Sequence, residues 1–285
     1  MTPRDWMLSA AAAALLCVPA VVRADELDQS VRGRVTAVDT SSGARGEFRL
    51  DVRLHNTKTT ETLTFRGDRL GALPDALGHV PVYHVVLIDA GATTTADFGA
   101  TRLSRGGHAG LHFDSRHTDF PGGVATLTQF GGGTFELQRD GAAVLRGSIP
   151  TFVGLTGKSA PGAVATFHGN SRLGPTASGG AGRGTIDAFA SNGPHRVVQR
   201  LRIAVRILGT IANPFSVVAI DSLGAETPLG TITTRGSHGD GALTFDTRRG
   251  ANIPTGDLAG LSGMKIEVRN GAGTAVLTGN FPSVP

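Results

Sequence analysis

The chain contains the same three sequence blocks twice, at one constant spacing. Residues 85–89 (VVLID), 113–116 (FDSR) and 144–150 (VLRGSIP) each recur 132 positions later, as VVAID, FDTR and VLTGNFP. Self-similarity at a fixed period indicates a repeated structural unit. We therefore expect two domains, at 25–150 and 162–285, joined by a Gly- and Pro-containing linker at 151–161. Gly46 also pairs with Gly184, so the first copy has about six extra residues, which we place in 71–81.

Within each copy the pattern is typical of β-strands. Residues 47–54 and 200–207 alternate strictly between polar and apolar side chains, which places all the large apolar groups on one face of a strand. Asp140-Gly141 and Asn270-Gly271 are dipeptides that favour tight hairpins. The sequence thus predicts an all-β protein of two tandem antiparallel β-sandwich domains, immunoglobulin-like, with seven or eight strands each.

The first 24 residues are typical of a signal peptide. Arg4 precedes an apolar run that is too short to span a membrane comfortably, and Val22-Arg23-Ala24 fits a cleavage site, with cleavage after Ala20 as the alternative. A lipoprotein anchor at Cys17 is disfavoured because Leu16 precedes it. No later stretch is apolar enough to span a membrane. We expect a secreted or periplasmic protein with no disulfide, since Cys17 is the only cysteine.

Charge gives little information about partners. The formal net charge of +4 reflects 27 basic and 23 acidic residues, and all but Lys58, Lys158 and Lys265 of the basic ones are arginine. Arginine bias together with abundant alanine and glycine is the ordinary product of a GC-rich genome. It does not by itself indicate an anionic partner.

The repeat unit resembles one found in uncharacterised secreted bacterial proteins. The resemblance is carried by 200–210, 217–221, 229–234, 245–254 and 266–279, and more loosely by 62–67 in the first copy. It implies a β fold and export, and no activity.

The repeated aspartates are predicted to form turns. Asp114 and Asp246 each follow an apolar strand residue and precede Ser or Thr and then Arg, a setting in which a carboxylate bonds its own backbone. Asp89 and Asp221, at the ends of apolar runs, have the same interpretation.

Histidines gather in the first copy. His108 and His112 are the weak candidates for a metal site, but no Cys and no HExxH spacing supports them, so no metal or cofactor is predicted. The alternative of an exported enzyme would use His79, His84, Asp75 or Asp89 in the longer loops of the first copy.

Arg200, Arg202 and Arg206 share one face of a predicted strand and are the candidate binding residues for an anionic polymer. The absence of aromatic residues between them disfavours nucleic acid. No catalytic frame is present, so the main functional hypothesis is an exported, non-enzymatic protein with a structural, adhesive or binding role in the cell envelope or extracellular matrix. The alternatives are the enzyme or metal-binding protein above and an anion-binding module that uses the Arg-rich strand.

Overall fold

The computed structural model describes residues 23–284 apart from 71–80, 105, 179–180 and 208–212. It confirms the prediction of an all-β antiparallel fold, and the described residues contain sixteen strands and no α-helix. The strands of the N-terminal half are β1 (Arg23–Ala37), β2 (Arg45–His55), β3 (Lys58–Asp68), β4 (Val82–Ile88), β5 (Thr95–Arg102), β6 (Ala109–Asp114), β7 (Thr134–Arg139) and β8 (Ala142–Ser148). Those of the C-terminal half are β9 (Ala163–Pro175), β10 (Arg183–Asn192), β11 (Val197–Arg206), β12 (Phe215–Ile220), β13 (Glu226–Ile232), β14 (Asp240–Asp246), β15 (Lys265–Arg269) and β16 (Ala275–Asn280). Short 3-10 turns are η1 (Thr40–Ser42), η2 (Leu127–Phe130), η3 (Thr247–Arg249) and η4 (Ala259–Leu261). No helix in this described part is long and apolar enough to cross a membrane.

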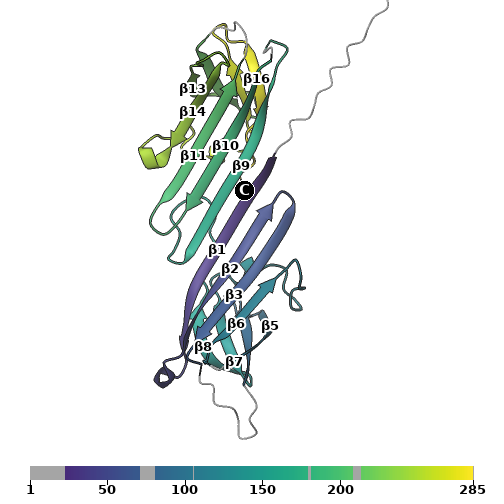
Figure 1. Ribbon diagram of the computed structural model, residues 1–285, viewed down its shortest axis with the longest axis vertical. Coiled ribbons are helices and arrows are strands. Elements are labelled where there is room, and N and C mark those ends of the chain that lie inside the picture. The colour runs from purple at the N-terminus through teal and green to yellow at the C-terminus, as the bar shows by residue number, and fades with distance from the viewer. Residues whose placement is uncertain (1–22, 71–80, 105, 179–180, 208–212, 285) are drawn as a thin grey trace, which may run out of the picture.

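One long sheet runs through both halves of the molecule. Its strand order is β6-β3-β2-β1-β9-β10-β11-β14, so β1 and β9 form the junction between the halves (Figure 1). A second layer covers each half, with strand order β5-β4-β7-β8 in one and β13-β12-β15-β16 in the other. The outer face of the long sheet is therefore continuous across the junction, and in the following we call this sheet the shared sheet.

Strands β1 and β9 each change layers near their C-terminal ends. β1 pairs with β2 along most of its length but reaches β8 through Thr36 and Ala37. β9 pairs with β10 and reaches β16 through Gly174 and Pro175. These corners join the two layers of each half into one hydrogen-bonded system.

The halves have corresponding registers. Gly46 lies opposite Val35, and Gly184 lies opposite Leu173, so β1 and β9 correspond at a spacing of 138 residues. Further on, Val85 in β4 and Val217 in β12 lie in corresponding strands at the spacing of 132 residues. The six-residue difference falls between β3 and β4, where residues 71–80 lie outside the described part of the chain.

The alternating segments form strands as their pattern requires. In β11, Leu201, Ile203 and Val205 are buried while Arg200 and Arg202 are exposed. Asp140 and Gly141 have φ values of 51° and 77°, as a tight type I′ hairpin needs. The second hairpin is longer than predicted, because Asn270 accepts hydrogen bonds from the N–H groups of Ala272 and Thr274 and begins a wider loop.

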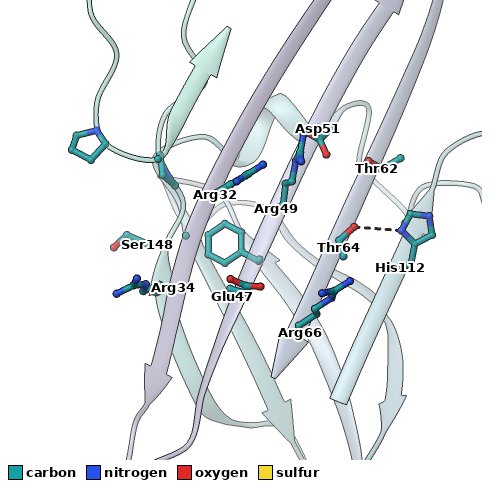
Figure 2. A pocket seen from close by; sticks show the side chains of 15 residues that line it. Arg32, Arg34, Glu47, Arg49, Asp51, Thr62, Thr64, Arg66, His112 and Ser148 are labelled. Atoms are coloured by element: carbon teal, nitrogen blue, oxygen red, sulfur yellow. Dashed lines mark hydrogen bonds and ion pairs between the residues drawn. The ribbon is translucent and has the colours of Figure 1, made fainter. Parts of the chain in front are cut away.

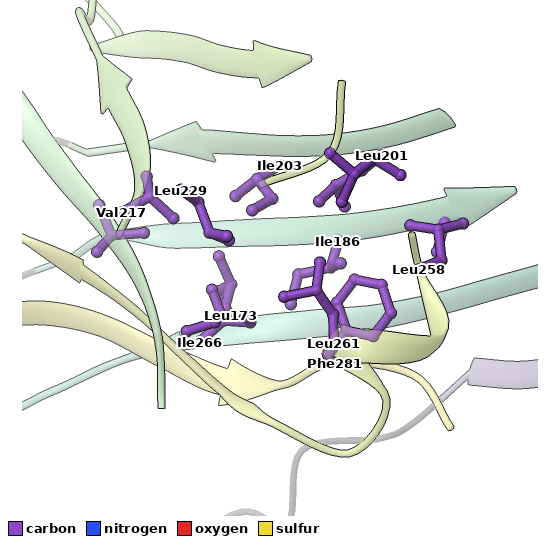
Figure 3. Packing of buried hydrophobic residues seen from close by; sticks show 14 of the residues in the cluster. Leu173, Ile186, Leu201, Ile203, Val217, Leu229, Leu258, Leu261, Ile266 and Phe281 are labelled. Atoms are coloured by element: carbon purple, nitrogen blue, oxygen red, sulfur yellow. The ribbon is translucent and has the colours of Figure 1, made fainter. Parts of the chain in front are cut away.

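Each half encloses its own apolar core between its two layers. The C-terminal core is mostly aliphatic and is closed at one end by Leu258 and Leu261 (Figure 3). The N-terminal core contains stacked rings, with Phe135 lying 4.7 Å from Phe48 and 5.2 Å from Phe65 between ring centroids. By strand register these three rings correspond to isoleucines of the C-terminal half, namely Ile186, Ile203 and Ile266.

The segment predicted as a linker, 151–161, packs against the halves that it connects. Leu155 is buried in the C-terminal core, and Val153 contacts both cores. The Val153 carbonyl accepts a hydrogen bond from Gln29 Nε2 at 3.0 Å, and the Gly154 carbonyl accepts one from Asn192 Nδ2. The connection is thus held to strands of both halves.

A buried polar side chain holds the same loop in each half. The Glu61 carboxylate is 4% exposed and accepts a hydrogen bond from the Leu127 N–H at 2.5 Å. At the corresponding place the Gln199 Oε1 accepts one from the Leu258 N–H at 3.1 Å. The Glu61 carboxylate and the Gln199 amide therefore accept the same loop hydrogen bond in the two halves.

This pairing predicts the effect of substituting Glu61. We expect Glu61→Gln to leave the free energy of unfolding nearly unchanged, because an amide oxygen makes this bond in the other half. Glu61→Leu should lower it by about 1–3 kcal/mol, because the buried Leu127 N–H loses its acceptor. Urea denaturation of both variants measures the difference, and equal losses would show that the charge of Glu61 is what matters.

Candidate functional site: an arginine groove on the shared sheet

The three arginines predicted to bind an anionic polymer lie on the outer face of β11, but two of them already contact other side chains of the protein. Arg206 Nε lies 2.7 Å from Asp240 Oδ1 on β14. The Arg200 guanidinium lies over the Phe189 ring, 5.8 Å from its centroid. Only Arg202 has no side-chain partner among the described residues, so this strand presents one free guanidinium rather than three.

The two repeated aspartates bond their own turns. Asp114 Oδ1 accepts a hydrogen bond from the Arg116 N–H at 2.9 Å, and Asp246 Oδ1 accepts one from the Arg248 N–H at 3.0 Å. Asp114 also receives the Arg116 guanidinium at 2.6 Å. These bonds from Arg116 hold the pKa of the Asp114 carboxyl well below its usual range.

The residues that follow the aspartates reach the neighbouring strand. The Ser115 hydroxyl accepts a hydrogen bond from the Glu61 N–H, and the Thr247 hydroxyl accepts one from the Gln199 N–H, both at 2.9 Å. The recurring FDS and FDT segments therefore join a local turn to the beginning of β3 or β11.

Three histidines of the N-terminal half, His84, His108 and His112, each contact a different partner. The Nδ1–Oδ distances are 2.7 Å both for His84 with Asp97 and for His108 with Asp68. His112 Nδ1 lies 3.4 Å from the Thr64 hydroxyl. No group of three metal-ligating side chains occurs among the residues that the structure describes.

The proposed enzyme residues are likewise not brought together in the described structure. His79 and Asp75 lie outside the described residues. Asp89 caps its own turn by accepting hydrogen bonds from the Thr93 hydroxyl at 2.6 Å and the Thr93 N–H at 2.8 Å. His84 points instead to Asp97 on β5.

A hollow of about 1000 Å³ lies elsewhere, on the outer face of the shared sheet in the N-terminal half (Figure 2). Its floor is formed by side chains from β1, β2, β3 and β6 that strand register places in rows. One row is Arg34, Glu47 and Arg66, and the next is Arg32, Arg49, Thr64 and His112. Ser148, Pro150 and Pro161 also line it.

Most of the arginines in this hollow form no ion pair with a described residue. Arg49 Nε lies 2.7 Å from Asp51 Oδ1, which neutralises it. Arg32, Arg34 and Arg66 are exposed and make no side-chain hydrogen bond or ion pair with any described residue. Arg32 also lies directly opposite Arg49, and the ion pair of Arg49 with Asp51 offsets the repulsion between these like charges.

Two smaller hollows continue this one across the junction. The second shares Arg32, Arg49 and Asp51 with the first and reaches Val164 and Thr166 on β9. The third shares Val164 and Pro194 with the second and ends at Arg248. We call the three together the arginine groove; their lining includes seven arginines and three carboxylates, which are Arg32, Arg34, Arg49, Arg53, Arg66, Arg196, Arg248, Asp28, Glu47 and Asp51.

Asp28 lies where the groove crosses from β1 to β9, opposite Thr166. Burial raises the pKa of its carboxyl, and the nearby Arg53, whose Nε lies 3.8 Å from Oδ1, opposes this shift. The Oδ1 atom is buried and has no hydrogen-bond partner among the described residues. The hollow at the junction thus contains two carboxylates, Asp28 and Asp51, beside three arginines.

Sequence reasoning did not find this groove. The alternation at 47–54 placed Arg49 on an outward face, but only the register with β1 and β3 brings Arg32, Arg34 and Arg66 beside it. The available signal was a set of outward arginines two residues apart on successive strands. Comparison of the sequence with protein-family models and with curated proteins gives no match.

Proposed function

We propose that this chain is an exported, non-enzymatic binding protein of the cell envelope or extracellular matrix, and that the arginine groove binds an anionic ligand. The observation that carries the proposal is the presence of three exposed, unpaired guanidiniums, those of Arg32, Arg34 and Arg66, inside one hollow. A guanidinium without a counter-charge is available for a carboxylate, sulfate or phosphate, which it binds through paired N–H donors.

Export is proposed from the signal peptide expected over residues 1–24. The two halves are proposed to be copies of one unit, supported by their corresponding strand orders and by the constant spacing of the repeated blocks. A sheet that continues through both copies offers a longer binding face than either copy alone. This suits a structural or adhesive role toward an extended partner.

The groove replaces the β11 arginines as the proposed binding surface. Arg200 and Arg206 already have partners in the protein. Breaking these contacts would reduce the free energy gained when an anion binds. Arg32, Arg34 and Arg66 have no such bonds to break.

Binding of dextran sulfate, with neutral dextran as the reference polymer, tests the proposal. We expect the chain from Asp25 onward to bind the sulfated polymer only, and Arg32→Ser/Arg34→Ser/Arg66→Ser to weaken binding about 10- to 100-fold. The estimate takes about 0.5–1 kcal/mol for each exposed charge contact and tenfold for each 1.4 kcal/mol.

The matched control is Arg102→Ser/Arg139→Ser/Arg235→Ser, which removes the same charge from three arginines outside the groove. Arg102 and Arg235 are exposed, and Arg139 is partly exposed. It should retain most of the affinity. An equal loss in both variants would mean that net charge, and not the groove, binds the polymer.

A further inference from the structure

We propose that the ligand of the arginine groove is an acidic polysaccharide, and that one chain of it lies across the β1–β9 junction and contacts both halves. This inference rests on the anion-binding function proposed above. It adds the class of ligand and the course that the ligand takes over the sheet.

The course follows from the continuity of the groove. It begins near His112 on β6, crosses β3, β2 and β1, passes Val164 and Thr166 on β9, and ends beside Phe189 and Arg248. Because neighbouring strands lie about 4.8 Å apart, the path from β6 to β11 is about 30 Å long. A ligand that fills it must be an extended chain lying across the strands.

The chemistry of the floor favours a sugar polymer. Carboxylates alternate with guanidiniums, as in the row of Arg34, Glu47 and Arg66, and hydroxyls of Thr62 and Thr64 lie beside them. A polysaccharide carries hydroxyl groups that can donate to the carboxylates, and anionic groups at intervals that can pair with the arginines. A DNA strand has no hydroxyl groups along its backbone that could donate to Glu47 and Asp51.

The groove also lacks the surfaces on which bases stack. Among its described lining residues the only phenyl rings are those of Phe48, which is 2% exposed, and Phe189, which lies under the Arg200 guanidinium. Binding of single-stranded nucleic acid depends on exposed aromatic side chains between the charges. Recognition by hydrogen bonds and ion pairs needs no such rings.

The C-terminal end of the groove has two arginines of its own that are at most loosely paired. Arg116 is held on Asp114 at 2.6 Å, whereas the corresponding Arg248 lies 3.9 Å from Asp246 and lines the groove. Arg196, in the β10–β11 hairpin, makes no side-chain bond with any described residue. Both are therefore available to the distal part of a ligand that is anchored in the N-terminal half.

The test is a length series of heparin-derived oligosaccharides, measured by calorimetry with the whole chain from Asp25 onward. We expect affinity to rise with length until the oligosaccharide spans the groove. Arg196→Ser/Arg248→Ser should weaken the long oligosaccharide about tenfold and leave the short one unchanged. Arg32→Ser/Arg34→Ser/Arg66→Ser should weaken both, and Arg102→Ser/Arg139→Ser should weaken neither.

Each other outcome is informative. If short and long oligosaccharides bind equally and Arg196→Ser/Arg248→Ser has no effect, a chain crossing the junction is ruled out while anion binding stands. If single-stranded DNA of similar length binds as tightly as the long oligosaccharide, the ligand class is wrong. If no polyanion binds in the groove, the proposed function fails together with this inference.

Discussion

Gly147→Ala and Gly279→Ala are each expected to lower the free energy of unfolding by about 3 kcal/mol or more, the upper range for overpacking. A Cβ at Gly147 would lie 2.2 Å from the Arg34 carbonyl oxygen, and a Cβ at Gly279 would lie 2.3 Å from the Arg172 carbonyl oxygen. Ordinary contacts of this kind have carbon–oxygen distances of about 3.3–3.6 Å. Both obstacles are backbone atoms, so no side-chain rotation can relieve the overlap.

These glycines occupy the corners where β1 meets β8 and where β9 meets β16. Thermal and urea unfolding of both variants would measure the loss. Gly174→Ala is the matched control, because a Cβ at this position of β9 has no atom within 4 Å. If Gly147→Ala or Gly279→Ala lowered the free energy of unfolding no more than Gly174→Ala does, the strands at this corner would have room to move apart.

Gly33→Ser is expected to lower the free energy of unfolding by a similar amount. A second substitution should recover part of this loss. A Cβ at Gly33 would lie 2.2 Å from Cζ of Phe48, whose buried ring is stacked on Phe135. In the C-terminal half the corresponding pair is Ser171 and Ile186, and the Ser171 hydroxyl donates a hydrogen bond to the Asn280 carbonyl at 2.6 Å. The large ring of Phe48 therefore requires a glycine at position 33. The smaller Ile186 leaves room for the side chain of Ser171.

A double-mutant cycle tests this complementarity. Phe48→Ile alone should cost about 1–3 kcal/mol through the space it leaves above Gly33. Gly33→Ser/Phe48→Ile should be more stable than Gly33→Ser alone, with a coupling free energy above about 1 kcal/mol. Gly122→Ser, at a position with open space, controls for the serine itself. Additive losses would contradict the complementarity.

The fold class was predictable because its signal is local. Alternation at 47–54 and 200–207 reports directly which side chains face a core, and both segments are strands. The role of β1 was not predictable, since polar Gln29 lies on the face of β1 that includes buried Val31. The structure shows why this is tolerated: Gln29 donates to the Val153 carbonyl of the connecting segment.

The candidate site was less predictable than the fold. A single strand shows that Arg200, Arg202 and Arg206 face outward, but not that Asp240 and Phe189 on neighbouring strands engage two of them. Conversely, the unpaired Arg32, Arg34 and Arg66 become neighbours only through the pairing of β1, β2 and β3. Whether an arginine is free to bind a ligand depends on which residues of the neighbouring strands lie beside it. The sequence of a single strand does not contain this information.

The placement of β1 has a consequence for biogenesis. This strand is the first of the described strands to be synthesised, yet one of its edges pairs with β9, more than a hundred residues later. Until β9 arrives, that edge exposes unpaired N–H and C=O groups, which can pair with any other available strand. We therefore expect the newly synthesised chain to need protection from self-association during this interval, and completion of the C-terminal half to be the event that ends the need.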